Sequence, residues 1–273
     1  MKTQRFLKAA MVAALCCGIS AGALADVPAR IELTNGTQID AKLRWMPASK
    51  RYVIIRQAPG GGPAIEQQVE ASEIARKQIA PPAGWRELLQ LAGQNPNAAI
   101  PQLLRIVDEY NMLEYDEEAA YVLGVLYLKT NKAKDFIKIA EKVVQDNPAA
   151  AISSKMAPAY WQALIETGST AGGKLNKMLD GAVATAPRPI AAKALIARGD
   201  QLKKAGQLRD SLKDGYLRAA LLYTQERDAN AEALYKASIV FDELNQATYA
   251  ERMRQELLTR HRTSEFAAKL RGN

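Results

Sequence analysis

The densest group of acidic residues in the chain comprises Glu114, Asp116, Glu117 and Glu118. Paired carboxylates of this kind can cleave a glycosidic bond or hold calcium. The spacing of a calcium-binding loop is missing, however, and Asp116 is a suitable N-cap for a helix over 117–129. Because the helix dipole favours acids in the first turn, we predict that these carboxylates stabilise a helix start and hold no metal.

A second segment comes close to a phosphate-binding loop. Gly168 is followed at the correct distance by Gly173 and Lys174, but Leu175 stands where a serine or threonine should contact magnesium. The segment also follows an expected helix, whereas a phosphate-binding loop must leave a strand. We therefore predict a turn between two helices, and we interpret the glycines over 60–62 as part of a loop between strands.

His261 is the only histidine, and it lies between Arg260 and Arg262 at the end of an expected helix. A cation at this position suits the helix dipole. A histidine could also activate a serine, but the chain has no strand-turn-helix serine motif. We predict no catalytic residue, no metal and no cofactor, and we retain a hydrolase with an unrecognised site as the third hypothesis.

The first 25 residues have the pattern of a cleavable signal peptide. A basic start is followed by small and apolar residues over 9–24 and by the small-x-small sequence Ala23-Leu24-Ala25. Cleavage there would export the chain to the periplasm without a cysteine. The alternatives are secretion, or an outer-membrane lipoprotein with lipid on Cys16 or Cys17, although neither cysteine has the preceding residues that lipid attachment requires.

The formal net charge of +8 is spread along the chain, without a block of five like charges. No basic-aromatic pattern indicates nucleic-acid binding, so we expect no nucleic-acid partner. After the first 25 residues no apolar run approaches 18 residues, and we expect no transmembrane segment after processing. The oligomeric state stays open.

Two regions follow with different periods, which predicts an α+β multidomain chain. Over 26–80 apolar residues alternate with polar ones, and Asn35-Gly36 is a strong hairpin signal. Four or five short strands in this length favour a small closed β-barrel. The prolines of the linker over 81–84 mark the boundary, and over 85–271 the period becomes 3.6, which indicates about five helical hairpins.

These regions are similar to two known architectures. The strand pattern resembles an SH3-like small barrel. Within the helical region, Ala120, Leu123, Gly124, Tyr127 and Pro148 match the tetratricopeptide-repeat pattern in order and spacing. Further matches occur around Gly199 and in a last hairpin from Leu234. The helical region therefore resembles the divergent tetratricopeptide-like solenoids of bacterial envelopes.

This resemblance implies that the first helix of each hairpin lines a concave groove. The groove positions that follow are Glu118, Tyr121, Val125 and Leu128 in one hairpin, Lys193, Ile196, Asp200 and Lys203 in another, and Glu232, Tyr235, Ile239 and Asp242 in the last. Aromatic and aliphatic side chains with charges of both signs suit a protein surface. We expect a non-enzymatic scaffold that binds a protein or peptide in the cell envelope, with Tyr121 and Tyr235 as anchors.

The alternative hypothesis is a cell-wall module whose β-region holds glycan or peptidoglycan. Trp45 and Tyr52 would then form the binding face. The same two aromatic residues could equally form the core of the small barrel.

Overall fold

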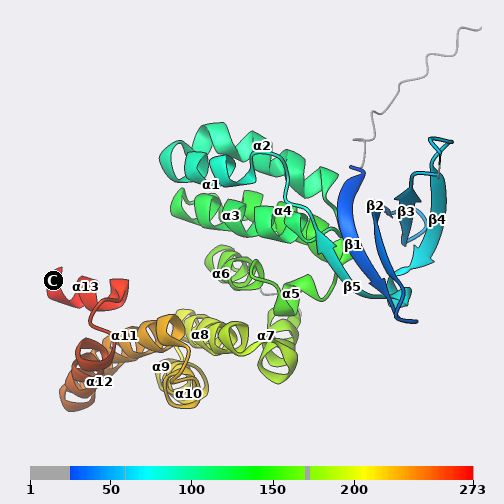
Figure 1. Ribbon diagram of the computed structural model, residues 1–273. Coiled ribbons are helices and arrows are strands. Elements are labelled where there is room, and N and C mark those ends of the chain that lie inside the picture. Colours follow the sequence, from blue (N-terminus) through cyan, green and yellow to red (C-terminus); the bar gives the residue numbers. More distant parts are fainter. Residues whose placement is uncertain (1–24, 59, 170–172, 273) are drawn as a thin grey trace, which may run out of the picture.

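The computed structural model describes residues 25–58, 60–169 and 173–272, and it shows an antiparallel sheet followed by a helical region (Figure 1). Apart from Ala25, the segment expected to be a signal peptide lies outside the described residues, as do Cys16 and Cys17. Within the described ranges, none of the helices combines the length and the apolar character that crossing a membrane requires.

The sheet contains five strands: β1 (Val27–Leu33), β2 (Gln38–Met46), β3 (Arg51–Arg56), β4 (Ile65–Glu70) and β5 (Ile74–Ile79). All neighbours are antiparallel, in the order β4-β3-β2-β1-β5, with Ile31 opposite both Ile39 and Lys77. A 3₁₀ turn (Ala71–Glu73) carries the chain from the β4 edge to β5, which pairs with β1. The sheet is open rather than the closed barrel expected from the sequence, because β4 and β5 form its two edges.

The buried face of the sheet is shared with the helical region. Alternation places Ile31, Leu43 and Ile54 on this face, and each is fully buried. Leu113, from the segment that connects the second and third helices, is buried in the same cluster. The Tyr52 hydroxyl donates a hydrogen bond to the carbonyl of Met112 at 2.8 Å. The sheet is therefore packed directly on the start of the helical array.

The first half of the helical region contains α1 (Trp85–Gln94), α2 (Pro96–Glu109), α3 (Tyr115–Lys129), α4 (Ala133–Asp146), α5 (Ala150–Ser153), α6 (Ala157–Thr167) and α7 (Lys174–Thr185). The second half contains α8 (Arg188–Lys204), α9 (Leu208–Asp210), the π-helix η3 (Ser211–Tyr216), α10 (Leu217–Leu222), α11 (Arg227–Glu243), α12 (Ala247–Arg260) and α13 (Glu265–Gly272).

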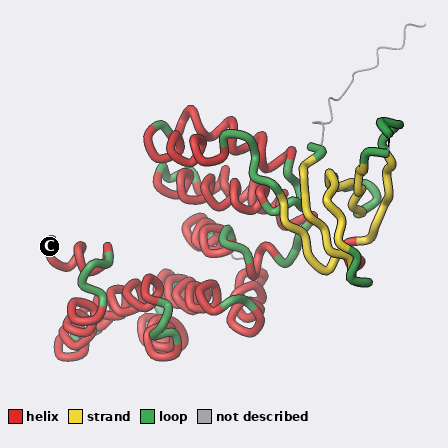
Figure 2. The backbone as a smooth tube through the Cα atoms, in the orientation of Figure 1, coloured by secondary structure: helices red, strands yellow, loops and turns green. Residues whose placement is uncertain are grey.

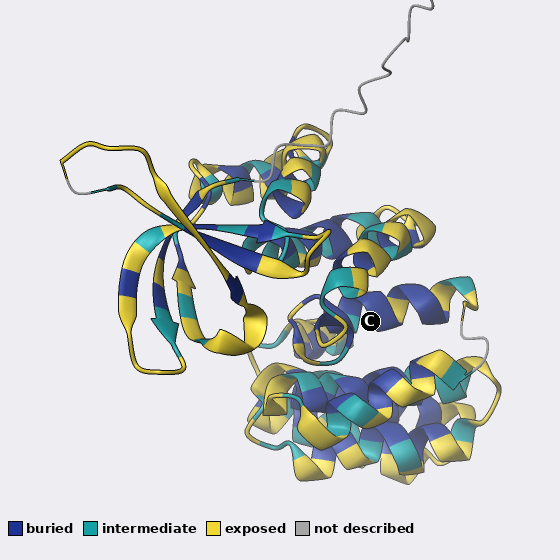
Figure 3. Ribbon diagram, turned by 90° about the vertical axis from the view of Figure 1, so that its right-hand side faces the viewer, coloured by how far each residue is buried: buried dark blue, intermediate teal, exposed yellow. Residues whose placement is uncertain are grey.

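Successive helices pack side by side and lead away from the sheet, so the C-terminus lies at the far end of the array (Figure 2). Their apolar residues form two buried clusters, one centred on α1–α7 and the other on α8–α13. Helix α8 contributes Ala194 to the first cluster and Leu195 to the second, and so it joins them. Figure 3 shows the resulting pattern, with buried residues between the helices and exposed residues outside.

Gly124 lies where α3, α4 and α6 approach one another closely. A Cβ atom built at Gly124 would lie 2.6 Å from the Phe136 ring and 2.9 Å from the Ala159 side chain. Any larger residue would therefore push α4 and α6 away from α3. Tyr127, three residues later, packs half-buried against the same cluster.

Asp116 does not have the capping position expected for it. Helix α3 begins one residue earlier, at Tyr115, and Glu114 holds the N-cap position with φ of 71°. Asp116 is buried instead, and its Oδ2 accepts a hydrogen bond from the backbone N–H of Met112 at 2.9 Å. Its carboxylate therefore holds the turn that docks on the sheet, a tertiary role that local sequence does not reveal.

Candidate functional site

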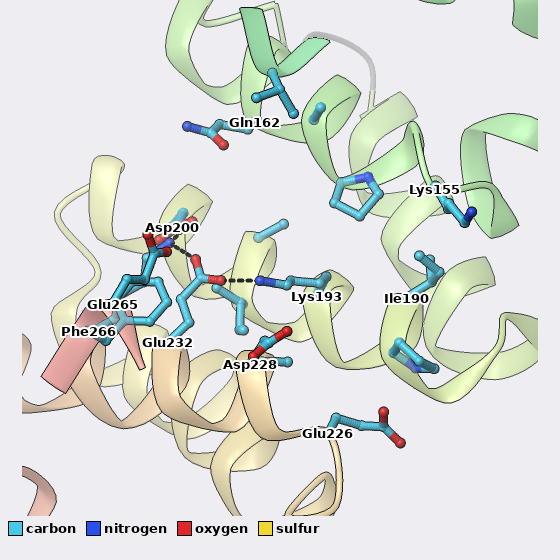
Figure 4. Close-up of a pocket in the computed structure, with 18 of the residues that line it drawn as sticks. Lys155, Gln162, Ile190, Lys193, Asp200, Glu226, Asp228, Glu232, Glu265 and Phe266 are labelled. Atoms are coloured by element: carbon cyan, nitrogen blue, oxygen red, sulfur yellow. Dashed lines mark hydrogen bonds and ion pairs between the residues drawn. The ribbon is translucent and has the colours of Figure 1, made fainter. Parts of the chain in front are cut away.

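A groove of about 1100 Å³ lies between the two halves of the array. We call it the central groove. One wall comes from α3 and α6, the other from α8 and α11, and α13 contributes Glu265 and Phe266 at its end. In Figure 4, Gln162 of the first wall faces Lys193, Asp200 and Glu232 of the second.

The first wall of the central groove is mainly apolar. Tyr121, Val125 and Leu128 follow one another along α3 at helical spacing, and Pro158 and Ala159 of α6 continue the surface. Tyr121 is 39% exposed although it belongs to a packed helix. An exposed tyrosine on an apolar wall provides a large contact area with a polar tip, a combination enriched in protein interfaces.

The second wall carries a linked set of four charged side chains, which we call the ion network. Glu232 accepts from Lys193 Nζ at 2.5 Å and from Lys236 Nζ at 2.8 Å. Lys236 Nζ also contacts Asp200 Oδ2 at 2.6 Å. Two lysines and two carboxylates cancel in charge within the ion network, which offers both donors and acceptors.

Burial and pairing oppose each other within the ion network. Burial alone would raise the pKa of Glu232, but Lys236 and Lys193 outweigh it and hold that pKa below its usual value. Burial would likewise lower the pKa of Lys236, but Glu232 and Asp200 reverse the effect and raise it. Glu232 and Lys236 are therefore both charged at neutral pH, and the ion pair between them is kept there.

A tight helix crossing supports the ion network from behind. The Tyr216 hydroxyl donates a hydrogen bond to Asp200 Oδ1 at 2.7 Å, and burial together with Asp200 raises the tyrosine pKa. Tyr216 ends the π-helix η3, a wider turn that is often found at functional sites. Beside it, a Cβ atom on Gly215 would lie 2.4 Å from the Cα of Gly199, so η3 and α8 touch backbone to backbone.

Seven of the twelve groove positions expected from the sequence line the central groove, and five do not. Those in the groove are Tyr121, Val125, Leu128, Lys193, Ile196, Asp200 and Glu232. Their agreement with the structure concerns position only, and their role in binding stays a prediction.

The five other positions, which include Ile239, are not among the residues that line the central groove. Glu118 contacts Lys155 at 2.6 Å, and Lys203 contacts Glu243 at 2.7 Å. Tyr235 and Asp242 line a separate hollow of about 380 Å³, where Asp242 forms an ion pair with Arg254. Tyr235 packs against Phe266 of α13, with 5.6 Å between the ring centroids, and the role of all five residues in binding stays a prediction.

The sequence analysis missed Lys236, Gln162 and Phe266 as groove residues. A lysine on a helix usually extends into water, so its type alone does not indicate a site. The spacing of Glu232 and Lys236, at i and i+4, was the available signal for an ion pair. Phe266 could not have been placed, because α13 folds back over the groove end through a turn without a distinctive pattern.

The other candidate residues have structural partners. His261 is buried, and its Nε2 lies 2.8 Å from Asn230 Oδ1, while Asn230 donates to the Ala220 carbonyl at 2.7 Å. Burial and Arg260 lower the His261 pKa, which favours the neutral ring. His261 thus joins the end of α12 to α10 and α11, and no serine takes part in the hydrogen bonds recorded for its ring.

Lys174 begins α7 and contacts Glu141 and the Tyr160 hydroxyl, so the segment from Gly168 does connect two helices as predicted. Trp45 and Tyr52 are each 3% exposed and pack against each other at 4.8 Å between ring centroids. They belong to the core of the sheet and present no open aromatic face.

Among the described residues, no group of three or more histidine, cysteine and acidic side chains is placed to hold a metal ion. Comparisons with protein-family models, with curated proteins and with solved structures found no match to this chain.

Proposed function

We propose that this chain is an exported, non-enzymatic adaptor that holds a segment of a partner protein or peptide in the central groove. The cell envelope would be its site of action, in keeping with the signal-peptide pattern at its start. The observation that supports the proposal best is the pairing of an apolar wall with a wall of ion-paired polar side chains across one groove.

The size of the central groove favours a polymer over a small molecule. Clefts for small ligands usually measure about 300–1000 Å³ and enclose most of the ligand. The groove, at about 1100 Å³, runs between two sets of helices and exposes parts of both walls. An extended segment or a short helix of a partner would fill such a space while its ends continue outside it.

The chemistry of the walls agrees with a peptide backbone and apolar side chains. Tyr121, Val125 and Leu128 can bury apolar side chains of the partner. The Glu232 carboxylate can accept hydrogen bonds from N–H groups of its backbone, and the Lys193 ammonium can donate to its carbonyl groups. An anionic ligand such as a phosphate is disfavoured, because each lysine of the ion network is already paired.

The proposal includes a relationship of the helical array to tetratricopeptide repeats, and of the sheet to SH3-like folds. Buried Ala120, Leu123 and Gly124 occupy the packing positions of such a repeat, and Gly199 makes a second close crossing. The sheet has five strands with a 3₁₀ turn before the last. The cell-wall alternative loses support, because the rings it requires are buried.

A photo-crosslinking experiment tests the groove as the binding site. Gln162 lines the central groove and is exposed, so replacing it with p-benzoylphenylalanine places a reactive ketone beside any bound segment. We expect irradiation of cells that make the full chain to yield a discrete cross-linked protein band. Mass spectrometry of that band should identify a segment with apolar residues. In the same cells, Tyr121→Ala should reduce the yield at least fivefold.

The matched control is the same replacement at Gln145, an exposed glutamine at the end of α4 outside the groove lining. Equal products at both positions, or no product at position 162, would contradict the groove as the binding site. Circular dichroism of the Tyr121→Ala chain checks that the helices are intact, which we expect because this side chain is partly exposed.

A further inference from the structure

A second hollow lies on the short helical run from α9 to α10 and shares no lining residue with the central groove. We call it the outer hollow. It measures about 400 Å³, and its lining includes Leu217, Leu221 and Leu244 together with Arg209, Lys213 and Arg218. The leucines come from α10 and the end of α11, so the hollow spans the corner between the two helices.

The leucines of α10 are exposed to an unusual degree. Leu221 is 74% exposed and the adjacent Leu222 is 58% exposed, the two highest values among the large apolar side chains described. Single exposed leucines are common on soluble proteins, and Leu222 lies outside the lining of the hollow. Leu221, however, lines it together with Leu217 and Leu244, and apolar side chains gathered in this way indicate a contact surface. Neither Leu221 nor Leu222 is needed for the core, because α10 buries Ala219 and Ala220 instead.

The charges around these leucines all have one sign. Of the described residues that line the outer hollow, three are cations and none is an acid. Arg209, Lys213 and Arg218 also form no ion pair with any described residue, whereas the lysines of the ion network are all paired. An apolar floor with a free basic rim is complementary to a ligand with apolar side chains and carboxylates.

We propose that the outer hollow docks an acidic amphipathic segment of a partner protein, as a site independent of the central groove. Apolar side chains of the segment pack on Leu217, Leu221 and Leu244, and its aspartates and glutamates meet Arg209 and Lys213. Two separate docking sites would make the chain a bridge between two proteins. Helix-in-groove binding of this kind uses apolar residues at i, i+3 or i+4, and i+7.

A membrane surface would fit the same helix less well. Asp210 is exposed on α9 and Asp214 follows on the next turn, so a flat anionic bilayer would meet both acids along with the cations. The outer hollow itself is concave and excludes them from its lining. A narrow segment can therefore reach the three cations and avoid the two acids.

Selection from a random library of 16-residue peptides displayed on phage, with the full chain as the target, tests this inference. We expect enriched peptides that carry several aspartates or glutamates around apolar residues at helical spacing. Recovery of these peptides should fall at least tenfold on Leu221→Gln and on Lys213→Glu. Tyr121→Ala, in the central groove, should leave it unchanged.

The matched controls are Leu89→Gln on α1 and Lys134→Glu on α4, which change an exposed leucine and an exposed lysine far from the outer hollow along the chain. Enriched peptides without acidic residues, equal losses in the controls, or no enrichment at all would overturn the inference. Sedimentation with phosphatidylglycerol vesicles that is abolished by Leu221→Gln would also overturn it, because it would assign the surface to a membrane.

Discussion

Asp116 is held in a position that penalises its charge. The residue is 1% exposed, and its Oδ1 is buried without a hydrogen-bond partner among the described atoms. Burial, with a contribution from Glu117, raises the pKa of Asp116 to about 6 even though the N–H of Met112 opposes this shift. A carboxyl group with a raised pKa binds its proton more tightly in the folded chain than in the unfolded one.

The stabilisation from protonated Asp116 is therefore fully present below about pH 4 and is lost as the pH rises through about 6. We expect Asp116→Asn, which removes the charge, to stabilise the chain by about 1–3 kcal/mol more at pH 7.5 than at pH 3.5. Urea unfolding of the unchanged chain and of the Asp116→Asn chain at the two pH values measures this difference. The contributions of the other titrating groups to the free energy of unfolding cancel, because both chains share those groups. An identical effect of the substitution at both pH values would contradict it.

Single residues differ in how far the sequence reveals them. Tyr121 and Val125 could be placed in the groove because neighbouring residues of their helix match a repeat pattern in order and spacing. Asp116 could be assigned to the start of α3 but not to the core, since its burial depends on a sheet some 60 residues earlier in the chain. Lys236 was missed because its partner Asp200 lies on another helix.

At the scale of elements, the crossing of α8 and η3 determines how the second wall of the central groove is built. Gly215 and Gly199 bring the two backbones together, and Tyr216 reaches Asp200 across that contact. The sequence predicts a helix over this region but not its π-helical turn, because a π-helix and an α-helix of this length show a similar spacing of apolar residues.

The presence of helical hairpins could be predicted from the sequence. The open sheet could not, since the alternation of apolar and polar residues does not show which strands form the edges.

Gly215→Ala tests the importance of this crossing. The new methyl group would meet the Gly199 backbone at 2.4–2.6 Å, so the two helices must separate. We expect a loss of about 2–4 kcal/mol in the free energy of unfolding, measured in urea. Gly93→Ala in α1 is the control: nothing lies within 4 Å of its added Cβ atom, and alanine favours a helix. A small effect at Gly215, similar to that at Gly93, would show that the crossing is loose.

At the scale of the whole molecule, the sheet and the helices share one interface. Leu113 is 1% exposed within the sheet cluster, and Tyr52 reaches the carbonyl of Met112. The prolines over 81–84 suggested a linker between separate units. The interface formed by the turn between α2 and α3 is a long-range contact that composition cannot reveal, and it ties the two regions together.

Leu113→Ala should therefore loosen both regions. We expect a loss of about 2–4 kcal/mol, and faster hydrogen exchange in β2 and β3 as well as in α2 and α3. Hydrogen-exchange mass spectrometry resolves these segments. Val143→Ala, an equally buried truncation in α4, should accelerate exchange in the helices without affecting the strands. Unchanged exchange in β2 and β3 of the Leu113→Ala chain would mean that the sheet is stable without this contact.

The π-helix η3 also sets the angle, measured about the helix axis, between the side chains that precede it in α9 and those that follow it in α10. Its wider turn accommodates one more residue than an α-helix of the same rise, and one residue corresponds to about 100° of rotation. Arg209 precedes this segment and Leu221 follows it, and both line the outer hollow. Loss of a single residue from 211–215 would keep the run helical while turning Leu221 away from Arg209. The length of this segment is therefore constrained more tightly than its composition.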